Sequence, residues 1–388
     1  MKVYLAGACD RNNFGDLLMP VVFEKQFKNK YKLNVTFDTY SMIKSDLSSI
    51  KANKTNALFE LYNKGVFLIF VGGEVLSADY TLMYYNLQKK GLKLFFIRVI
   101  HKFFPRVIEI LSRKILGGKS YSPWVLNKKD FGCRKIIYNT VGGDVKNESF
   151  NDLKTADYIS VRNKKDYNKI KKINSNVNLC PDSITAISNI IPSDLINNNV
   201  QKDIKDMCND SYFIVQVDER NSRDLIRIIA EQINTICEKC NINCILLPIG
   251  YAQGHEDQIA LAKIYKNCNY ERVKFTRKTN IYETLYILKN STFFIGTSLH
   301  GIIISTSYCV PHMILTDRIN KLIDYMKTWK TSPILYSDAD QIFNNFCKLY
   351  NNVDYKRKLK IKSKELIQLV DNNFDRINDM IVKEYENE

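Results

Sequence analysis

The sequence predicts an α/β fold made of two domains, each with a parallel sheet. Short apolar runs alternate with stretches of helical periodicity along most of the 388 residues, an order typical of parallel sheets covered by helices. A chain of this length can bury two or three cores. A polar stretch near residues 190–210, which contains Pro192 and has no periodicity, separates two halves. We therefore expect two α/β domains with a cleft between them.

The first domain is expected over residues 1–195, with an insertion at about 80–134. Its strands are predicted from five apolar runs, each followed by a polar or glycine-rich loop: residues 2–8, 66–73, 135–143, 157–162 and 177–182. In doubly wound sheets, ligands bind outside the carboxyl ends of the strands. The residues directly after these runs are therefore candidates for a binding site.

The second domain is expected over residues 196–335. Four further apolar runs predict its strands, at residues 212–218, 244–250, 292–297 and 312–317. They alternate with helical patterns at residues 222–240, 255–267, 280–290 and 300–308. Residues 336–388 are expected to form C-terminal helices that pack back on the domains, because the stretch from Tyr355 onward has a helical period.

The chain is basic, and its excess charge is concentrated in one segment. There are 57 Lys and Arg residues against 41 Asp and Glu residues, which gives a net charge of +16 and predicts an anionic partner. Twelve basic residues lie between Lys89 and Arg134, together with only Glu109 and Asp130. The rest of the chain is only mildly basic, so no nucleic-acid partner is expected.

Residues 93–116 form a basic amphipathic segment inside this region. Most of its side chains are Phe, Ile, Leu or Val, and Pro105 is expected to kink the helix. Four cations fall near one helical stripe: Arg98, Lys102, Arg106 and Arg113. Such a helix can lie in an anionic membrane interface. It can equally be a core helix with one solvated face, or a contact with another protein.

The location expected for the chain is cytoplasmic, peripheral at the inner face of the cell membrane. The apolar run at residues 3–8 is too short for a secretory signal, and the uncharged stretch 290–316 contains histidine, proline and many hydroxyls, unlike a membrane span. The ten cysteines are scattered, which favours reduced thiols. Their one cluster, Cys237, Cys240 and Cys244, lacks a fourth ligand, so no metal site is expected.

The most informative motif is FFIGTSLHGIIIS at residues 293–305, where a buried strand leads into an apolar helix. The turn supplies hydroxyls from Thr297 and Ser298, the imidazole of His300 and the N–H groups of a helix N-terminus. This combination suits a phosphate or a carboxylate. His300 is a candidate general acid or base; the alternative is a core histidine bonded to backbone.

Glycine-rich or acidic loops follow other predicted strands. The loop at residues 7–20 contains Asn13 and Asp16, and paired glycines precede Glu74 and Asp144. Such loops can approach a ligand closely and offer amide groups and a carboxylate. The alternatives are a helix-capping Asp16 and ordinary tight turns.

Further polar groups are expected at the carboxyl ends of strands. Arg162 ends its strand, and its guanidinium can clamp a carboxylate or phosphate with two hydrogen bonds. Asp182 ends the next strand, and His255 and Asp257 follow the run PIGYAQG. The alternatives for these last three residues are a turn and a helix N-terminus.

Together these motifs resemble the polysaccharide pyruvyl transferase family. The resemblance covers roughly residues 3–320 and is carried, in order, by NFGD, GGE, ISVRN, CPDSI, PIG…HEDQ and GTSLHGIIIS…VPHMIL. It implies two Rossmann-like domains in a GT-B-like arrangement with a C-terminal helical stretch. It also implies phosphoenolpyruvate as donor, which is a co-substrate, so no cofactor is expected, and a sugar in a cell-surface polysaccharide or its lipid-linked precursor as acceptor. Two sugar hydroxyls would then receive the pyruvyl group as a ketal.

The resemblance also implies roles for individual residues. His300 would be the general acid or phosphate ligand, Arg162 the clamp on the donor, and Asp16 or Asp182 a group that orients or deprotonates acceptor hydroxyls. The donor-binding residues would be Gly296, Thr297, Ser298, Leu299, Gly301, Arg318 and Arg220. The acceptor-binding residues would be Asn13, Gly72, Gly73, Glu74, Asp182, His255 and Asp257.

The sequence departs from the family pattern at three places. Ser298 stands where many members have an arginine, so donor binding would need another cation, for which Arg318, Arg277 and Arg220 are candidates. Glu74 replaces the third glycine of a GGG-type loop, and the stretch at about 80–134 is longer than the family core. Two other functions therefore remain open: a GT-B glycosyltransferase that uses a nucleotide sugar, and a non-catalytic, membrane-associated scaffold of the same fold.

Overall fold

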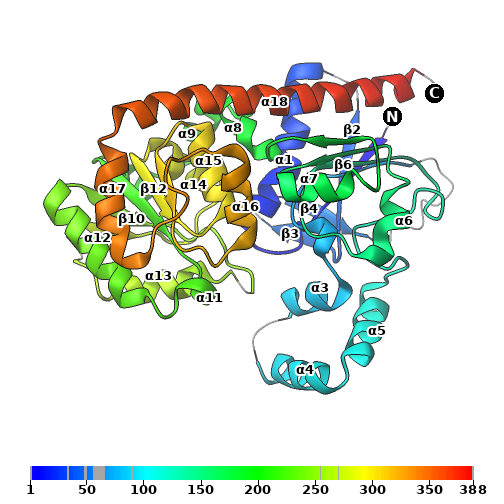
Figure 1. The fold of residues 1–388 in the computed structure, drawn as a ribbon, viewed down its shortest axis with the longest axis horizontal. Coiled ribbons are helices and arrows are strands. Elements are labelled where there is room, and N and C mark those ends of the chain that lie inside the picture. Colours follow the sequence, from blue (N-terminus) through cyan, green and yellow to red (C-terminus); the bar gives the residue numbers. More distant parts are fainter. Residues whose placement is uncertain are drawn as a thin grey trace. The chain divides into compact units, whose positions relative to one another are not determined.

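The computed structural model describes residues 2–32, 35–47, 50–55, 66–88, 91–253, 255–269 and 271–386. The chain divides into two compact units (Figure 1): unit 1 is Met1–Ser183 with Asn373–Glu388, and unit 2 is Ile184–Asn372. The division falls somewhat before the boundary predicted at residue 195. Lys89 and Lys90 of the basic segment lie outside the described residues.

The described residues of unit 1 contain an eight-stranded sheet in the order β3-β4-β2-β1-β5-β6-β7-β8. All neighbouring strands are parallel except β3 and β4. The strands are β1 (Lys2–Ala6), β2 (Thr36–Ser41), β3 (Ser45–Leu47), β4 (Ile50–Lys54), β5 (Val66–Phe70), β6 (Cys133–Val141), β7 (Tyr158–Val161) and β8 (Val177–Leu179).

The five strands predicted for this domain are confirmed, and three others were not predicted. β5 reads VFLIF and every one of its residues is buried, as is typical of a parallel strand covered on both faces. β2, β3 and β4 alternate polar with apolar residues and are only partly buried, because they form one edge of the sheet. They therefore lack the continuous apolar run from which the other strands were predicted.

The helices of unit 1 flank this sheet, except for one pair. They are α1 (Phe14–Gln26), which continues as the π-helix η1 (Phe27–Tyr31), η2 (Val75–Ser77), α3 (Tyr80–Asn86), α4 (Leu92–Phe103), α5 (Pro105–Leu116), η3 (Asn147–Ser149), α6 (Phe150–Leu153) and α7 (Lys164–Ile170). In Figure 1, α4 and α5 lie away from the sheet of unit 1, beyond α3.

The single kinked helix predicted at residues 93–116 is wrong. The segment forms two helices, α4 and α5, which we call the α4–α5 hairpin (residues 92–116). The break falls at Phe104, whose φ of −132° and ψ of 63° are not helical, and Pro105 begins α5. Proline is well tolerated at the first position of a helix, where its missing N–H would have no partner.

Unit 2 contains a five-stranded parallel sheet in the order β11-β10-β9-β12-β13. Its strands are β9 (Tyr212–Gln216), β10 (Asn243–Leu246), β11 (Val273–Phe275), β12 (Phe293–Gly296) and β13 (His312–Ile314). The four predicted strands and the four helical patterns between them are confirmed, whereas β11, only three residues long, was not predicted.

Before the long C-terminal helix, the described part of unit 2 contains ten α-helices and two short 3-10 helices. They are η4 (Ser183–Ala186), which begins at the last residue of unit 1, and α8 (Ile187–Ile190), α9 (Ser193–Asn198), α10 (Lys202–Met207), α11 (Glu219–Ser222), α12 (Ile226–Cys240), α13 (Asp257–Tyr265), α14 (Ile281–Asn290), α15 (Leu299–Ser307), α16 (Asn320–Trp329), η5 (Ala339–Gln341) and α17 (Ile342–Tyr350). The core between them and the sheet includes Phe213, Ile295, Met313 and Phe346.

The C-terminal helix α18 (Val353–Tyr385) is 33 residues long. Its first part belongs to unit 2, where the hydroxyl of Tyr355 bonds the backbone of His312. Its last part belongs to unit 1, where Asn373 bonds the side chains of Tyr158 and Asn139. Within the described chain, no helix combines the length and apolar character needed to cross a bilayer.

Candidate functional site

Each sheet has one position at which the order of the strands reverses. In unit 1, β2 and β4 lie on one side of β1, and β5 lies on the other. In unit 2, β10 and β11 lie on one side of β9, and β12 lies on the other. Loops that leave such neighbouring strands in opposite directions open a crevice at their carboxyl ends, where ligands of this fold class bind. The candidate sites are therefore the loops after β1 and β5, and those after β9 and β12.

The site in unit 1 brings together predicted residues from four loops. Arg162 follows β7, and its guanidinium donates a hydrogen bond of 3.0 Å to Asp182, which follows β8. It also forms an ion pair with Glu74, which follows β5. Arg162 is only 2% exposed, and Asp182 is fully buried.

The ion pairs fix the charge state of Arg162. Burial disfavours a charged guanidinium, but the carboxylates of Glu74 and Asp182 outweigh this effect and raise the pKa of Arg162 above its ordinary value. Arg162 was predicted to clamp the donor. In the structure both of its terminal nitrogens already bond carboxylates, so it holds Glu74 and Asp182 in place instead.

Glycines allow these side chains to approach the backbone. A Cβ atom at Gly142 would lie 2.8 Å from Nε of Arg162 and 3.0 Å from Oε1 of Glu74, so only glycine fits beside this ion pair. Gly73 has a φ of 83°, and a Cβ there would lie 3.7 Å from Oδ1 of Asp16. Asp16 is thus next to the Glu74 loop.

Asn13 and Asp16 occupy the start of α1. Asn13 is the N-cap of the helix but makes no side-chain capping bond, and Asp16 lies in the first turn. Both are half-buried. The helix dipole favours a carboxylate in the first turn. The position of Asp16 is therefore compatible both with stabilising the start of the helix and with binding a ligand.

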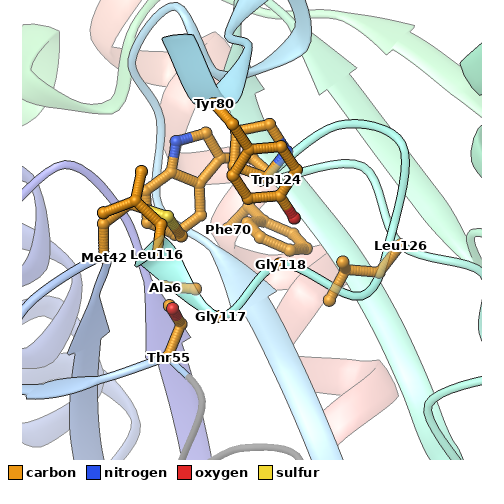
Figure 2. A pocket seen from close by; sticks show the side chains of 11 residues that line it. Ala6, Met42, Thr55, Phe70, Tyr80, Leu116, Gly117, Gly118, Trp124 and Leu126 are labelled. Carbon is orange, nitrogen blue, oxygen red and sulfur yellow. The ribbon is translucent and has the colours of Figure 1, made fainter. Parts of the chain in front are cut away.

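A pocket lies over the same carboxyl ends in unit 1, and it was not predicted (Figure 2). One part of its lining comes from residues at or just after the ends of β1, β2, β4 and β5: Ala6, Met42, Thr55 and Phe70. Residues of the insertion complete the lining: Tyr80, Leu116, Gly117, Gly118, Pro123, Trp124 and Leu126. The pocket lining is mainly aromatic and aliphatic, with hydroxyls from Thr55 and Tyr80.

The site in unit 2 is built around the N-terminus of α15. Ser298 caps the helix, and its hydroxyl accepts a hydrogen bond of 3.3 Å from the N–H of Gly301. His300 is the second residue of the helix and is half-buried. A Cβ atom at Gly301 would lie 2.3 Å from the ring of Phe294, so this glycine lets the helix pack closely on its own strand.

The loop after β9 is tied to the loop after β12. Oε1 of Gln216 accepts a hydrogen bond of 3.1 Å from the N–H of Thr297, and the N–H of Asp218 donates one of 3.1 Å to the hydroxyl of Thr297. Gln216 and Asp218 were not among the predicted site residues. The available signal was that polar residues end the apolar run YFIVQVD.

Asp257, predicted to bind the acceptor, is buried among hydrogen-bond donors of its own domain. Its Oδ2 accepts hydrogen bonds from the Gln216 side chain (2.9 Å) and from the N–H groups of Ile249 (3.0 Å) and Gly250 (2.8 Å). Burial raises the pKa of Asp257 to about 8, although these donors lower it. The carboxyl group is enclosed, and its bonds to Ile249 and Gly250 hold the loop after β10. His255, in the same loop, is exposed.

The three arginines proposed to replace the missing family cation differ in their surroundings. Arg318 makes two hydrogen bonds of 2.8 Å to Asp224. Arg277 bonds Asp203 and Glu283. Arg220, in α11, is exposed and makes no ion pair within the described part of the chain. Arg220 lies in the first helix after β9, the strand at which the order of this sheet reverses.

No metal site is evident at either set of loops. Among the described residues, no group of three or more His, Cys, Asp or Glu side chains is arranged to hold a metal ion. Cys237 and Cys244, from the cluster considered in the sequence, are buried in the core of unit 2, and burial raises the pKa of Cys237 to about 12.

Comparisons with known proteins agree with the motif analysis. The family model described as polysaccharide pyruvyl transferase matches residues 13–317. No curated protein matches the chain.

Several solved structures share the fold. The UDP-GlcNAc 2-epimerase from Neisseria meningitidis has a TM-score of 0.56 and 12% identity, over 99% of this chain and 100% of that one. A putative UDP-N-acetylglucosamine 2-epimerase from Listeria monocytogenes has a TM-score of 0.54 and 11% identity, over 100% and 97% of the two chains. The fold class is therefore GT-B-like, with two Rossmann-like domains.

Proposed function

The chain belongs to the polysaccharide pyruvyl transferase family, and we propose that it transfers the enolpyruvyl group of phosphoenolpyruvate to two hydroxyls of a sugar, forming a pyruvate ketal. The sugar belongs to a cell-surface polysaccharide or to its lipid-linked precursor, and the enzyme acts in the cytoplasm. The observation that carries this proposal is the position of His300 at the N-terminus of α15, beside β9 at the strand reversal of unit 2.

The reaction balances without an oxidant or a cofactor. A proton adds to the terminal carbon of phosphoenolpyruvate, C3, which becomes a methyl group, and C2 becomes electrophilic. One sugar hydroxyl bonds to C2, and the bond from C2 to the phosphate oxygen breaks. The second hydroxyl then bonds to C2, and the two hydroxyl protons replace the proton used at C3 and protonate the phosphate or solvent. A positioned acid and cations near the phosphate accelerate such a sequence.

The loops of unit 2 can supply the donor site. The first turn of α15 directs N–H groups outward, and anions bind at such helix ends because of these groups and the helix dipole. Arg220 adds an exposed guanidinium after β9, and His300 adds an imidazole that can donate or accept a proton. In this proposal His300 protonates C3 or bonds the phosphate, and Arg220 takes the place of the arginine that Ser298 replaces.

The loops of unit 1 can supply an acceptor site. Asp16 is half-buried and adjoins Gly73, and a carboxylate there can accept a hydrogen bond from a sugar hydroxyl and take up its proton. Arg162 then acts as a positioning residue, because it binds the carboxylates of Glu74 and Asp182.

The direct test is phosphate release from phosphoenolpyruvate in the presence of a panel of hexose and N-acetylhexosamine acceptors. We expect acceptor-dependent release by the wild type and a loss of about 100-fold or more in His300→Ala. Release that is equal in both proteins would remove His300 from the mechanism. A scaffold without catalysis would release no phosphate, and its function in cells would survive His300→Ala.

A second candidate is a glycosyltransferase that uses a nucleotide sugar. It is favoured by the fold, because the similar epimerase from Neisseria meningitidis is bound to UDP-GlcNAc, and a helix N-terminus can also bind a pyrophosphate. Thermal unfolding separates the two. Millimolar phosphoenolpyruvate should raise Tm, whereas UDP should not; the reverse result would favour the glycosyltransferase.

A further inference from the structure

The α4–α5 hairpin carries a large apolar surface on its outer side. On α4, the side that faces the rest of unit 1 contains Leu94, which is buried, and His101, whose ring meets the ring of Tyr85 with centroids 5.6 Å apart. Ile97 is half-buried, and six other large apolar residues of α4 are exposed: Leu92, Phe95, Phe96, Val99, Ile100 and Phe103. At 3.6 residues per turn, these residues share the side opposite Leu94 and His101. The polarity of α4 is thus the reverse of that of a surface helix in a globular protein.

The second helix of the hairpin, α5, also exposes apolar residues to solvent. Its buried stripe is Ile108, Ser112 and Leu116, by which α5 packs on α3 and α4. Its other large apolar residues are exposed on one side of this stripe: Val107, Ile110, Leu111 and Ile115. Arg106, Glu109 and Arg113 lie on the other side.

The break between the helices adds Phe104, directly after Phe103 of α4. Phe103 is 67% exposed and Phe104 is 61% exposed. Contiguous apolar surface of this kind on a folded protein marks a contact with another protein or with a membrane. The charges decide between these partners.

The described side chains of the hairpin carry five cations and one carboxylate: Arg98, Lys102, Arg106, Arg113, Lys114 and Glu109. Two copies joined through this surface would bring cations together, whereas anionic lipid headgroups would neutralise them. Lys114 lies between exposed apolar residues, and its long side chain can extend its amine to the headgroup level. We propose that the α4–α5 hairpin inserts its outer apolar side into one leaflet of an anionic lipid bilayer.

The hairpin is continuous with the pocket of unit 1. α5 ends at Leu116, and Leu116, Gly117 and Gly118 all line that pocket (Figure 2). The last turn of α5 therefore connects the proposed membrane-binding surface to the pocket at the carboxyl ends of β1 and β5. If the proposed function holds, this arrangement suits an acceptor sugar linked to a lipid of the same membrane.

Vesicle flotation of the full chain tests the insertion. We expect the wild type to float with vesicles of phosphatidylglycerol and phosphatidylcholine, and Phe103→Asp with Ile110→Asp to lower the bound fraction at least tenfold. Ile361→Asp is the matched control, because Ile361 is equally exposed (60%) but lies on α18. Arg98→Gln with Lys102→Gln should weaken binding to the anionic vesicles about thirty-fold.

Several results would overturn the proposal. The first is that the wild type does not float with the vesicles. The second is that Ile361→Asp loses flotation as much as the double variant. The third is that light scattering shows a dimer of the wild type and no dimer of Phe103→Asp with Ile110→Asp. Flotation needs neither phosphoenolpyruvate nor an acceptor, so its result is independent of whether the chain transfers pyruvyl groups. Unchanged phosphate release from a soluble acceptor, or an unchanged Tm, shows that a variant that fails to float is folded.

Discussion

The guanidinium of Arg162 and the carboxylate of Asp182 form a hydrogen-bonded ion pair of 3.0 Å in which both side chains are buried. Arg162 also pairs with Glu74, so one cation connects the loops that follow β5, β7 and β8. Charges buried in this way are costly unless they are paired. The ion pairs of Arg162 therefore hold these three loops of unit 1 in place, and the network depends on the charge of Arg162.

Removing this cation should destabilise the fold. Arg162→Ala leaves two carboxylates without their partner, one of them fully buried, and we expect a loss of about 3–5 kcal/mol in the free energy of unfolding. Urea denaturation measures this difference. Lys169→Ala, which removes the exposed ion pair with Asp144, is the control and should cost at most about 1 kcal/mol. Similar effects of both substitutions would show that the buried network is not structurally important.

The arginines of unit 2 should differ in their effect on the donor. Arg220→Gln removes an exposed cation without an ion pair in the described chain, and we expect it to weaken phosphoenolpyruvate binding roughly 10- to 100-fold, the range of a charge-assisted hydrogen bond. Arg318→Gln is the matched control, because Arg318 is occupied by Asp224. The dependence of Tm on phosphoenolpyruvate concentration reports both affinities. A larger effect of Arg318→Gln would move the donor to the loop after β13.

Much of the fold was predictable because the central strands are buried on both faces. β5 and β9 read as continuous apolar runs, whereas β4, which lies next to the edge strand β3, and β2, which lies next to β4, carry polar side chains and gave no such signal. These strands are therefore recognised only from their pairing in three dimensions.

The candidate site was predictable in position but not in its ion pairs. His300 and Glu74 follow apolar runs, and this alone placed them at the carboxyl ends of strands. The partners of Arg162 lie 88 and 20 residues away in the sequence, and no local pattern indicates that they occupy its guanidinium. The sequence likewise did not predict that the apolar side of α4 faces outward, because a helical period does not show which side of a helix faces the protein.

The shape of the pocket in unit 1 should depend on Gly118. A Cβ atom there would lie 2.2 Å from the ring of Tyr80, which is buried and hydrogen-bonded to Ser120. Because this ring cannot easily move away, we expect Gly118→Ala to destabilise the fold by about 1–3 kcal/mol through overpacking. At Gly91, an added Cβ would meet nothing within 4 Å, so Gly91→Ala is the control. Equal unfolding midpoints in thermal denaturation would contradict this account of the pocket.

Asp257 should make the stability of the protein depend on pH. Burial raises its pKa from 3.8 to about 8, so between about pH 4 and pH 8 the folded state keeps a proton that the unfolded state has lost. The contribution of Asp257 to the free energy of unfolding is therefore greatest below pH 4 and is lost as the pH rises through this window.

Asp257→Asn isolates this contribution, because asparagine is neutral at every pH and can still accept hydrogen bonds from the N–H groups of Ile249 and Gly250. We expect the free energy of unfolding of the variant to fall less steeply from pH 5 to pH 8 than that of the wild type. Denaturant titrations at several pH values measure both slopes, with the exposed Asp46→Asn as control. Parallel curves for the wild type and Asp257→Asn would mean that the carboxylate is already ionised in the folded state, stabilised by its three N–H donors.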